Sequence, residues 1–114
     1  MRVGDLYVAD FGGLDVRGYE QAGTRPALIV HSDEFLRIPS LALVCPLTTR
    51  ARGVPNHVPV VADDRNRLKS DCFVMTEQLR AIDRRFLLGY IGAVSPAVTH
   101  TVLAVIRSRL LAAP

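Results

Sequence analysis

Short apolar segments separated by turn-forming residues make up most of the chain. Segments of about four to eight residues that are bounded by Gly, Pro, Asn, Asp or Ser are typical of β-strands. The pattern predicts strands at residues 4–11, 25–31, 41–48, 57–62, 71–79 and 88–94. Pro26 and Pro59 fall inside two of these segments. Because proline cannot donate a hydrogen bond to a neighbouring strand, we expect each proline at an edge or an end of its strand.

The C-terminal segment follows a helical period instead. Ser95 is placed to cap a helix and Pro96 to occupy its first position, which is a strong start signal. Apolar residues then recur every three or four positions, at Val98, Val102, Val105, Ile106 and Leu110. Residues 32–40 are expected to hold at most one short helical turn. The chain therefore predicts a mainly β fold, a small, strongly bent antiparallel sheet or barrel with short helices and a C-terminal amphipathic helix.

The length of 114 residues predicts a single domain over residues 1–114. No apolar run approaches the roughly 20 residues of a membrane span, and Asp5 interrupts the N-terminus before a signal peptide could form. We therefore expect a cytoplasmic protein with no membrane partner. Cys45 and Cys72 lie in apolar runs and are expected to be free thiols in the core. The spacing of Cys and His residues fits no metal site, so neither a metal nor a cofactor is predicted.

The charge is modest but its composition is unusual. The net charge is +3, and every one of the 14 basic residues except Lys69 is an arginine. Arginine binds phosphate through two parallel hydrogen bonds and stacks on bases. A nucleic-acid partner would explain this composition, and a GC-rich genome would explain it equally well. Both interpretations stay open on composition alone.

Polar groups of complementary chemistry gather where predicted strands begin or end. Glu20 lies in a glycine-rich loop, five residues before Arg25, which opens the second strand. Thr48 and Thr49 mark the point where the third strand enters a basic turn. Carboxylate, guanidinium and hydroxyl groups at such positions suit a metal-independent phosphodiester site. A simple ion pair between Glu20 and Arg25 is the structural alternative.

The fifth predicted strand ends in a further polar set, Glu77, Gln78 and Arg80. In an extended strand Glu77 would share one face with Leu79, and Gln78 would share the other with Arg80. A carboxylate flanked by core residues needs a partner, and Arg80 is the expected one. Glu77 and Gln78 therefore serve either the site or the support of Arg80.

Four segments occur in a characteristic order: "GDLYVADF", "GYEQAGTRPALIV", "VCPLTT" and "TEQLRAID", followed by the C-terminal helix. In this order the chain resembles the MazF/PemK/Kid family of toxin endoribonucleases from type II toxin–antitoxin systems. The resemblance implies an SH3-like barrel and a homodimer. It also implies sequence-specific, metal-independent cleavage of single-stranded RNA (mRNA, or alternatively rRNA or tRNA) by attack of the ribose 2′-OH to give a 2′,3′-cyclic phosphate. Such cleavage inhibits translation and growth, and a cognate MazE-like antitoxin neutralises it by lying over the RNA groove.

The resemblance also implies roles for individual residues. Arg25 matches the signature arginine and would stabilise charge on the phosphate and also supply a proton, while Thr48 would bind a phosphate oxygen. Glu20 would be either the general base or the partner of Arg25. RNA-binding candidates are Tyr19, Gln21, Thr49, Arg50, Arg52, Glu77, Gln78 and Arg80. Loops 12–18, 49–56 and 63–70 are candidates for contacts to bases.

Histidine is the usual acid or base of a ribonuclease, but it does not occupy the expected place here. Some members carry a histidine where this chain has Tyr19. His31, His57 and His100 match no catalytic position of the family, so we expect surface or structural roles for them. No histidine is therefore assigned as the general acid.

Two alternative functions come from other classes. CcdB-type toxins share the barrel but poison DNA gyrase through their C-terminal helix, and they lack the E-Q-x-G-x-R-P loop that this chain has at residues 20–26. A catalytically inactive member that binds only RNA or antitoxin is the other alternative.

Overall fold

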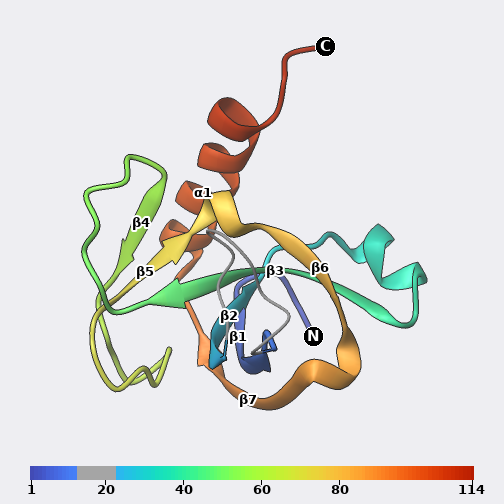
Figure 1. The fold of residues 1–114 in the computed structure, drawn as a ribbon, viewed down its shortest axis with the longest axis horizontal. Helices are drawn as coiled ribbons and strands as arrows, with labels where there is room; N and C mark the ends of the chain where they lie inside the picture. Colours follow the sequence, from blue (N-terminus) through green and yellow to red (C-terminus); the bar gives the residue numbers. More distant parts are fainter. Residues whose placement is uncertain (13–22) are drawn as a thin grey trace.

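The computed structural model describes residues 1–12 and 23–114. They form one bent, seven-stranded sheet and a C-terminal helix (Figure 1). The strands are β1 (Asp5–Asp10), β2 (Thr24–Ile29), β3 (Leu41–Thr48), β4 (His57–Val60), β5 (Cys72–Met75), β6 (Arg80–Asp83) and β7 (Leu87–Ala93). The helical elements are the 3₁₀ turns η1 (Asp33–Arg37), η2 (Thr76–Gln78) and η3 (Arg84–Phe86), the α-helix α1 (Pro96–Val105) and a π-helical turn, η4 (Ile106–Leu110).

All the strand pairs are antiparallel, in the order β4-β5-β3-β2-β1-β7, with β6 beside β3. This confirms the predicted mainly β fold of bent antiparallel strands. The strand path is open, because β4 and β7 lie at its two ends and do not pair within the described residues. The sheet is therefore not closed into a barrel.

Strand β3 is the centre of the fold. Along one side it pairs with β2, and along the other it pairs first with β6, from Leu41 to Val44, and then with β5, at Leu47 and Thr48. The change of partner lets the sheet bend sharply beside β3, as Figure 1 shows. Near its C-terminal end β3 therefore lies between β2 and β5. This end of the strand carries the polar residue Thr48 and lies at one edge of the sheet, which we call its rim.

The prediction of one strand over residues 71–79 is wrong beyond Met75. Thr76–Gln78 form the 3₁₀ turn η2, and β6 follows as a separate strand. Thr76 is fully buried, and its hydroxyl donates a hydrogen bond to the carbonyl oxygen of Asn56 at 2.7 Å. Because these residues form a turn held by this long-range contact, their side chains do not alternate as they would in a strand. The strand faces predicted for Glu77 and Arg80 are therefore wrong.

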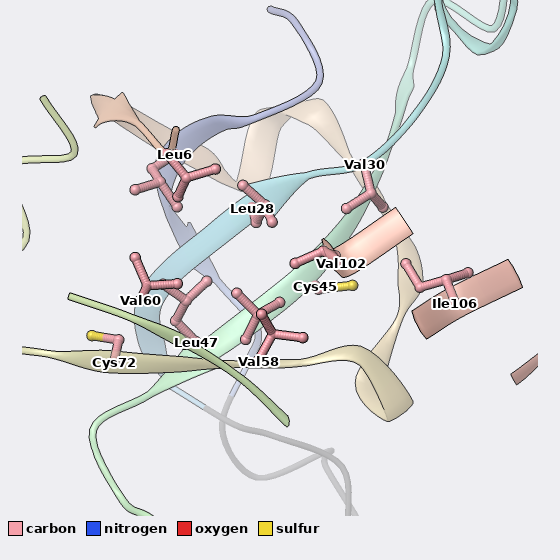
Figure 2. Packing of buried hydrophobic residues seen from close by; sticks show 12 residues of the cluster. Leu6, Leu28, Val30, Cys45, Leu47, Val58, Val60, Cys72, Val102 and Ile106 are labelled. Atoms are coloured by element: carbon pink, nitrogen blue, oxygen red, sulfur yellow. The ribbon is translucent and has the colours of Figure 1, made fainter. Parts of the chain in front are cut away.

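Two apolar clusters occupy the two faces of the central strands. The larger cluster lies between the sheet and the C-terminal helix, where Val102 and Ile106 meet Leu28 and Cys45 (Figure 2). Ala27 and Ile29 point into the second cluster, whereas Leu28 and Val30 point into the first, as strand alternation requires. Strand β2, which carries Arg25 at its beginning, is thus held firmly from both faces.

The predicted helix start and the predicted core thiols are confirmed. The Ser95 hydroxyl accepts a hydrogen bond from the backbone N–H of Val98 at 3.2 Å, and Pro96 is the first helical residue. Cys45 and Cys72 are both free and buried. Burial, with a smaller contribution from the charge of Glu77, raises the pKa of Cys45 to about 12. This thiol therefore stays protonated at neutral pH. Among the described helices, none is both long and apolar enough to cross a membrane.

Candidate functional site

Arg25 and Thr48 lie on neighbouring strands at one end of the sheet. In the pairing of β2 with β3, Ala27 faces Pro46, so Arg25 and Thr48 each lie two residues beyond that pair, at the same end of the two strands. The guanidinium Nη1 of Arg25 donates a hydrogen bond to the carbonyl oxygen of Leu47 at 3.4 Å. The register thus brings together the two residues that the sequence marked as catalytic candidates.

Thr48 is buried at the rim, with 6% of its surface exposed. Its hydroxyl oxygen accepts a hydrogen bond from the backbone N–H of Arg50 at 3.2 Å. A hydroxyl that accepts in this way still has its own hydrogen to donate. Thr48 is therefore held in place by the turn that follows it, and its O–H remains available for a bound oxyanion.

Arg25 and Thr48 open into a pocket of about 720 Å³. Most of its described lining comes from the beginning of β2, from the end of β3 with the turn after it, and from the loop that leads into β5. Val8 of β1 and Ile91 of β7 complete it. Val8, Leu47, Cys72 and Ile91 supply apolar surface, and the polar lining consists of Thr24, Arg25, Thr48, Thr49, Arg50, Arg52, Arg67, Lys69 and Ser70. The predicted residues Thr49, Arg50 and Arg52 thus share a pocket with Arg25 and Thr48.

The pocket is strongly and uniformly positive. Arg25, Arg50, Arg52, Arg67 and Lys69 line it, and no carboxylate belongs to its described lining. Burial lowers the pKa of Arg25, and the positive charges of Arg52 and Arg50 lower it further. The buried Nε of Arg25 has no acceptor within the described residues. An anion in this pocket would supply both the missing negative charge and the missing acceptor.

Glu77 lies apart from this pocket. Its carboxylate contacts Nε2 of His57 at 2.8 Å, whereas the sequence had suggested Arg80 as its partner. The imidazole of His57 is almost completely buried, with 4% of the side chain exposed. The pair connects η2 to the beginning of β4, so a structural role for His57 agrees with its position. Gln78, also in η2, is absent from the described lining of the pocket.

Arg80 belongs to a second, smaller depression of about 350 Å³. Its guanidinium lies over the ring of Phe11, 4.5 Å from the ring centroid, and Nη2 donates to the carbonyl oxygen of Phe11 at 3.5 Å. The rest of the described lining of this depression includes Asp10, Asp83 and Phe86. Of the predicted RNA-binding residues that the structure describes, Thr49, Arg50 and Arg52 line the larger pocket, Arg80 lines the smaller depression, and Glu77 and Gln78 line neither.

The candidates Tyr19, Glu20 and Gln21 lie outside the described residues. The backbone N–H of Phe11 donates to the carbonyl oxygen of Gly23 at 2.9 Å, so the two ends of the segment that contains them are joined. The roles of these three residues stay predictions.

The pocket residues Arg67, Lys69 and Ser70 were not among the individually numbered site residues predicted from the sequence. Their loop was expected only as a source of base contacts. The sequence signal that could have identified the two cations is the alternation of Asn66 and Leu68 with Arg67 and Lys69. In the structure Asn66 is buried and Leu68 is half-buried, whereas both cations are exposed.

The chain matches a known class of toxins both in sequence and in fold. The family model for the PemK-like, MazF-like toxin of type II toxin–antitoxin systems matches residues 2–110. The chain therefore belongs to this family. It is also 33% identical, over 89 residues, to the endoribonuclease MazF of Staphylococcus saprophyticus, and the match covers 76% of this chain and 72% of that protein.

Solved structures agree with the family. MazF from Deinococcus radiodurans has a TM-score of 0.80 and 27% sequence identity, with 96% of each chain covered. An endoribonuclease of a mycobacterial species, solved in complex with its cognate antitoxin, has a TM-score of 0.73 and 24% identity, with 100% of this chain and 99% of that one covered. The second likeness supports the fold alone.

Proposed function

We propose that this protein is an endoribonuclease toxin that cuts single-stranded RNA at a short sequence motif, with mRNA as its first target. The observation that carries the proposal is the placement of Arg25 and Thr48 on adjacent strands at the rim of a pocket whose described charged residues are all cationic. Membership in the toxin family and the likeness to a protein named endoribonuclease MazF support the same activity. Cleavage of mRNA would stop translation and growth.

The same proposal includes two protein partners. MazF of Deinococcus radiodurans has been solved with MazE, and the mycobacterial endoribonuclease with its cognate antitoxin. By analogy this chain is expected to bind a MazE-like antitoxin, whose acidic groups would suit the cationic pocket. A homodimer follows from the family resemblance and from the prevalence of two-fold assemblies, and a mass measurement in solution tests it.

The proposed reaction is an in-line transfer within the RNA. A base removes the proton of the ribose 2′-OH, and O2′ bonds to the adjacent phosphorus while the bond from phosphorus to O5′ breaks. The leaving O5′ takes up a proton, so the products end in a 2′,3′-cyclic phosphate and a 5′-OH. Negative charge grows on the non-bridging oxygens during the attack, and fixed donors aimed at those oxygens lower the barrier most.

Arg25 and Thr48 are suited to supply those donors. The guanidinium offers several N–H groups in a planar fork. The Thr48 hydroxyl can still donate its own hydrogen, since the hydrogen bond from the N–H of Arg50 uses only its oxygen. The hydrogen bond from Arg25 to Leu47 and the burial of Thr48 restrict both groups before substrate arrives. Such fixed groups need little reorganisation when charge develops.

The surroundings of Arg25 also bear on proton transfer. Burial and the neighbouring arginines lower its pKa, which is the direction that makes an arginine a better proton donor. A bound phosphate would act in the opposite direction and hold the proton on the guanidinium. We therefore assign charge stabilisation to Arg25 first and protonation of O5′ second. Glu20 is proposed as the base, with its pairing to Arg25 as the alternative.

The test of this function is incubation of the purified protein with a long single-stranded RNA in EDTA. Within the described residues, no three His, Cys, Asp or Glu side chains are grouped as metal ligands would be, and metal independence stays a prediction that the chelator tests. We expect cuts at one recurring short motif, with 2′,3′-cyclic phosphate ends. Intact RNA together with inhibition of DNA gyrase would contradict the proposal and favour a CcdB-like activity.

A further inference from the structure

The loop between β4 and β5 is built around one buried amide. Asn66 has 1% of its surface exposed. Its Oδ1 accepts from the backbone N–H groups of Asp63 and Leu68, both at 3.0 Å, and its Nδ2 donates to the carbonyl oxygen of Val61 at 2.8 Å. The Asp63 carboxylate accepts in turn from the N–H groups of Arg65 and Asn66, at 2.9 and 2.7 Å. Side-chain hydrogen bonds to the backbone therefore fix the loop from within.

The loop is also packed tightly against β7. The N–H of Ala93 donates to the carbonyl oxygen of Arg65 at 3.2 Å. A Cβ atom added to Gly92 would lie 2.5 Å from the carbonyl oxygen of Arg65 and 2.7 Å from that of Asn66. Only a glycine permits the loop backbone to approach β7 this closely, and any larger residue at this position would push the loop away from the sheet.

This fixed loop presents two cations to the pocket. Leu68 packs against the larger apolar cluster, while Arg67 and Lys69, on either side of it, are exposed and line the same pocket as Arg25. Arg67 has a φ angle of 55°, in the left-handed region that residues other than glycine adopt at a cost. Arg67 lines the pocket from this conformation.

Neither Arg67 nor Lys69 forms an ion pair within the described residues. Across the pocket lie Arg25, Arg50 and Arg52, which are cations too. One phosphate beside Arg25 and Thr48 would leave the charges on the β4–β5 loop uncompensated. A chain of phosphates that passes through the pocket would meet cations on both walls.

We propose that Arg67 and Lys69 form a second phosphate subsite, which binds a backbone phosphate of the RNA next to the scissile one, and that Asn66 and Gly92 position it. The inference rests on the proposed function, since it names a further contact of the same substrate in the same pocket. Arg67 and Lys69 would hold the strand in register for attack at Arg25 without contacting the reacting atoms. Backbone contacts of this kind fix position and carry no sequence information.

The test measures binding separately from cleavage. The probe is a fluorescent, random-sequence, single-stranded DNA of 20 nucleotides, which lacks the 2′-OH and cannot be cut by internal attack. Its Kd is measured over a range of salt concentrations for the wild type and for the double variant Arg67→Gln/Lys69→Gln. Each phosphate neutralised on a single strand contributes about 0.7 to the slope of log Kd against log salt concentration, so loss of the one phosphate bound by Arg67 and Lys69 should lower the slope by about 0.7.

The matched control removes two exposed cations outside the described pocket lining, in Arg2→Gln/Arg107→Gln. We expect the slope of this control to equal that of the wild type. An unchanged slope in the Arg67→Gln/Lys69→Gln variant, or an equal loss in both double variants, would overturn the subsite. A wild-type protein that does not bind the DNA would overturn it as well.

Two glycines of β7 test the positioning. Gly92→Ala should lower the slope because the added methyl group displaces the loop, whereas a Cβ at Gly89 meets no atom within 4 Å, so Gly89→Ala should leave the slope unchanged. Equal slopes in the two variants, with both folded by circular dichroism, would overturn the role of Gly92. If the slopes behave as expected but the wild type cuts no RNA, the phosphate subsite stands and the proposed nuclease function falls.

Discussion

Arg25→Ala is expected to lower kcat/KM for RNA cleavage by about 10²- to 10³-fold, the loss typical of removing one donor to a developing oxyanion. The fold should tolerate the change. Arg25 donates one hydrogen bond of 3.4 Å to Leu47, and its charge is disfavoured by burial and by Arg52 and Arg50. We expect the free energy of unfolding to change by no more than about 1 kcal/mol. Single-turnover cleavage of a defined RNA and thermal melting provide the two measurements.

Two variants make this result specific. Arg25→Lys keeps the positive charge but loses the planar fork, so its activity should fall between those of the wild type and Arg25→Ala. Arg107→Ala removes an exposed arginine of the C-terminal helix and should leave cleavage unchanged. If Arg25→Ala cuts RNA at the wild-type rate, the assignment of Arg25 is wrong.

Thr48→Val is expected to lower kcat/KM by about 10- to 100-fold. The substitution keeps the shape of the side chain but removes the hydroxyl, and a hydrogen bond to a charged group contributes about 1.5–3 kcal/mol. It also removes the acceptor for the N–H of Arg50, so a small loss of stability should accompany the loss of activity. Rates under single-turnover conditions measure the effect.

Thr101→Val is the matched control, because Thr101 is an exposed threonine of α1 outside the described lining of the pocket. We expect its rate to stay within a few-fold of the wild type, about 1 kcal/mol or less in the barrier. An equal loss of activity in Thr101→Val and Thr48→Val would contradict the assignment of Thr48.

Much of the fold was predictable because its signals are local. The uninterrupted apolar run in β2 indicated a strand, and its two buried faces then followed from the pairing. The start of α1 was readable from Ser95 and Pro96, since a hydroxyl cap and an N-terminal proline act within one turn of the helix. Signals of this kind need no knowledge of distant residues.

The error after Met75 has a non-local cause. The segment 71–79 has the composition of a continuous strand, yet Thr76 turns inward and bonds to the carbonyl oxygen of Asn56, 20 residues earlier. Glu77 accordingly meets His57 from the beginning of β4. The local sequence pattern does not indicate Asn56 or His57 as partners, because the pairing of β4 with β5 brings them to Thr76 and Glu77.

The candidate site was also predicted in part, with its residues on β2 and β3 identified more fully than those on the β4–β5 loop. The resemblance to a known family singled out Arg25 and Thr48, and the pairing of β2 with β3 brings them together. The β4–β5 loop and its arginines were named only as sources of contacts to bases, and Lys69 was not named as a site residue. The geometry of this loop depends on the burial of Asn66 and on the approach of Gly92, and both are tertiary features.

The most direct test of the central claim uses one RNA oligonucleotide in two forms. The first contains a cut site mapped with the wild-type protein, and the second differs only by a 2′-deoxyribose immediately upstream of the cut. We expect the all-ribose form to be cut in EDTA to a 2′,3′-cyclic phosphate, and the single 2′-deoxy substitution to abolish the cut while binding is retained. Cleavage of the substituted form at the same position would contradict attack by the 2′-OH in the Arg25 pocket.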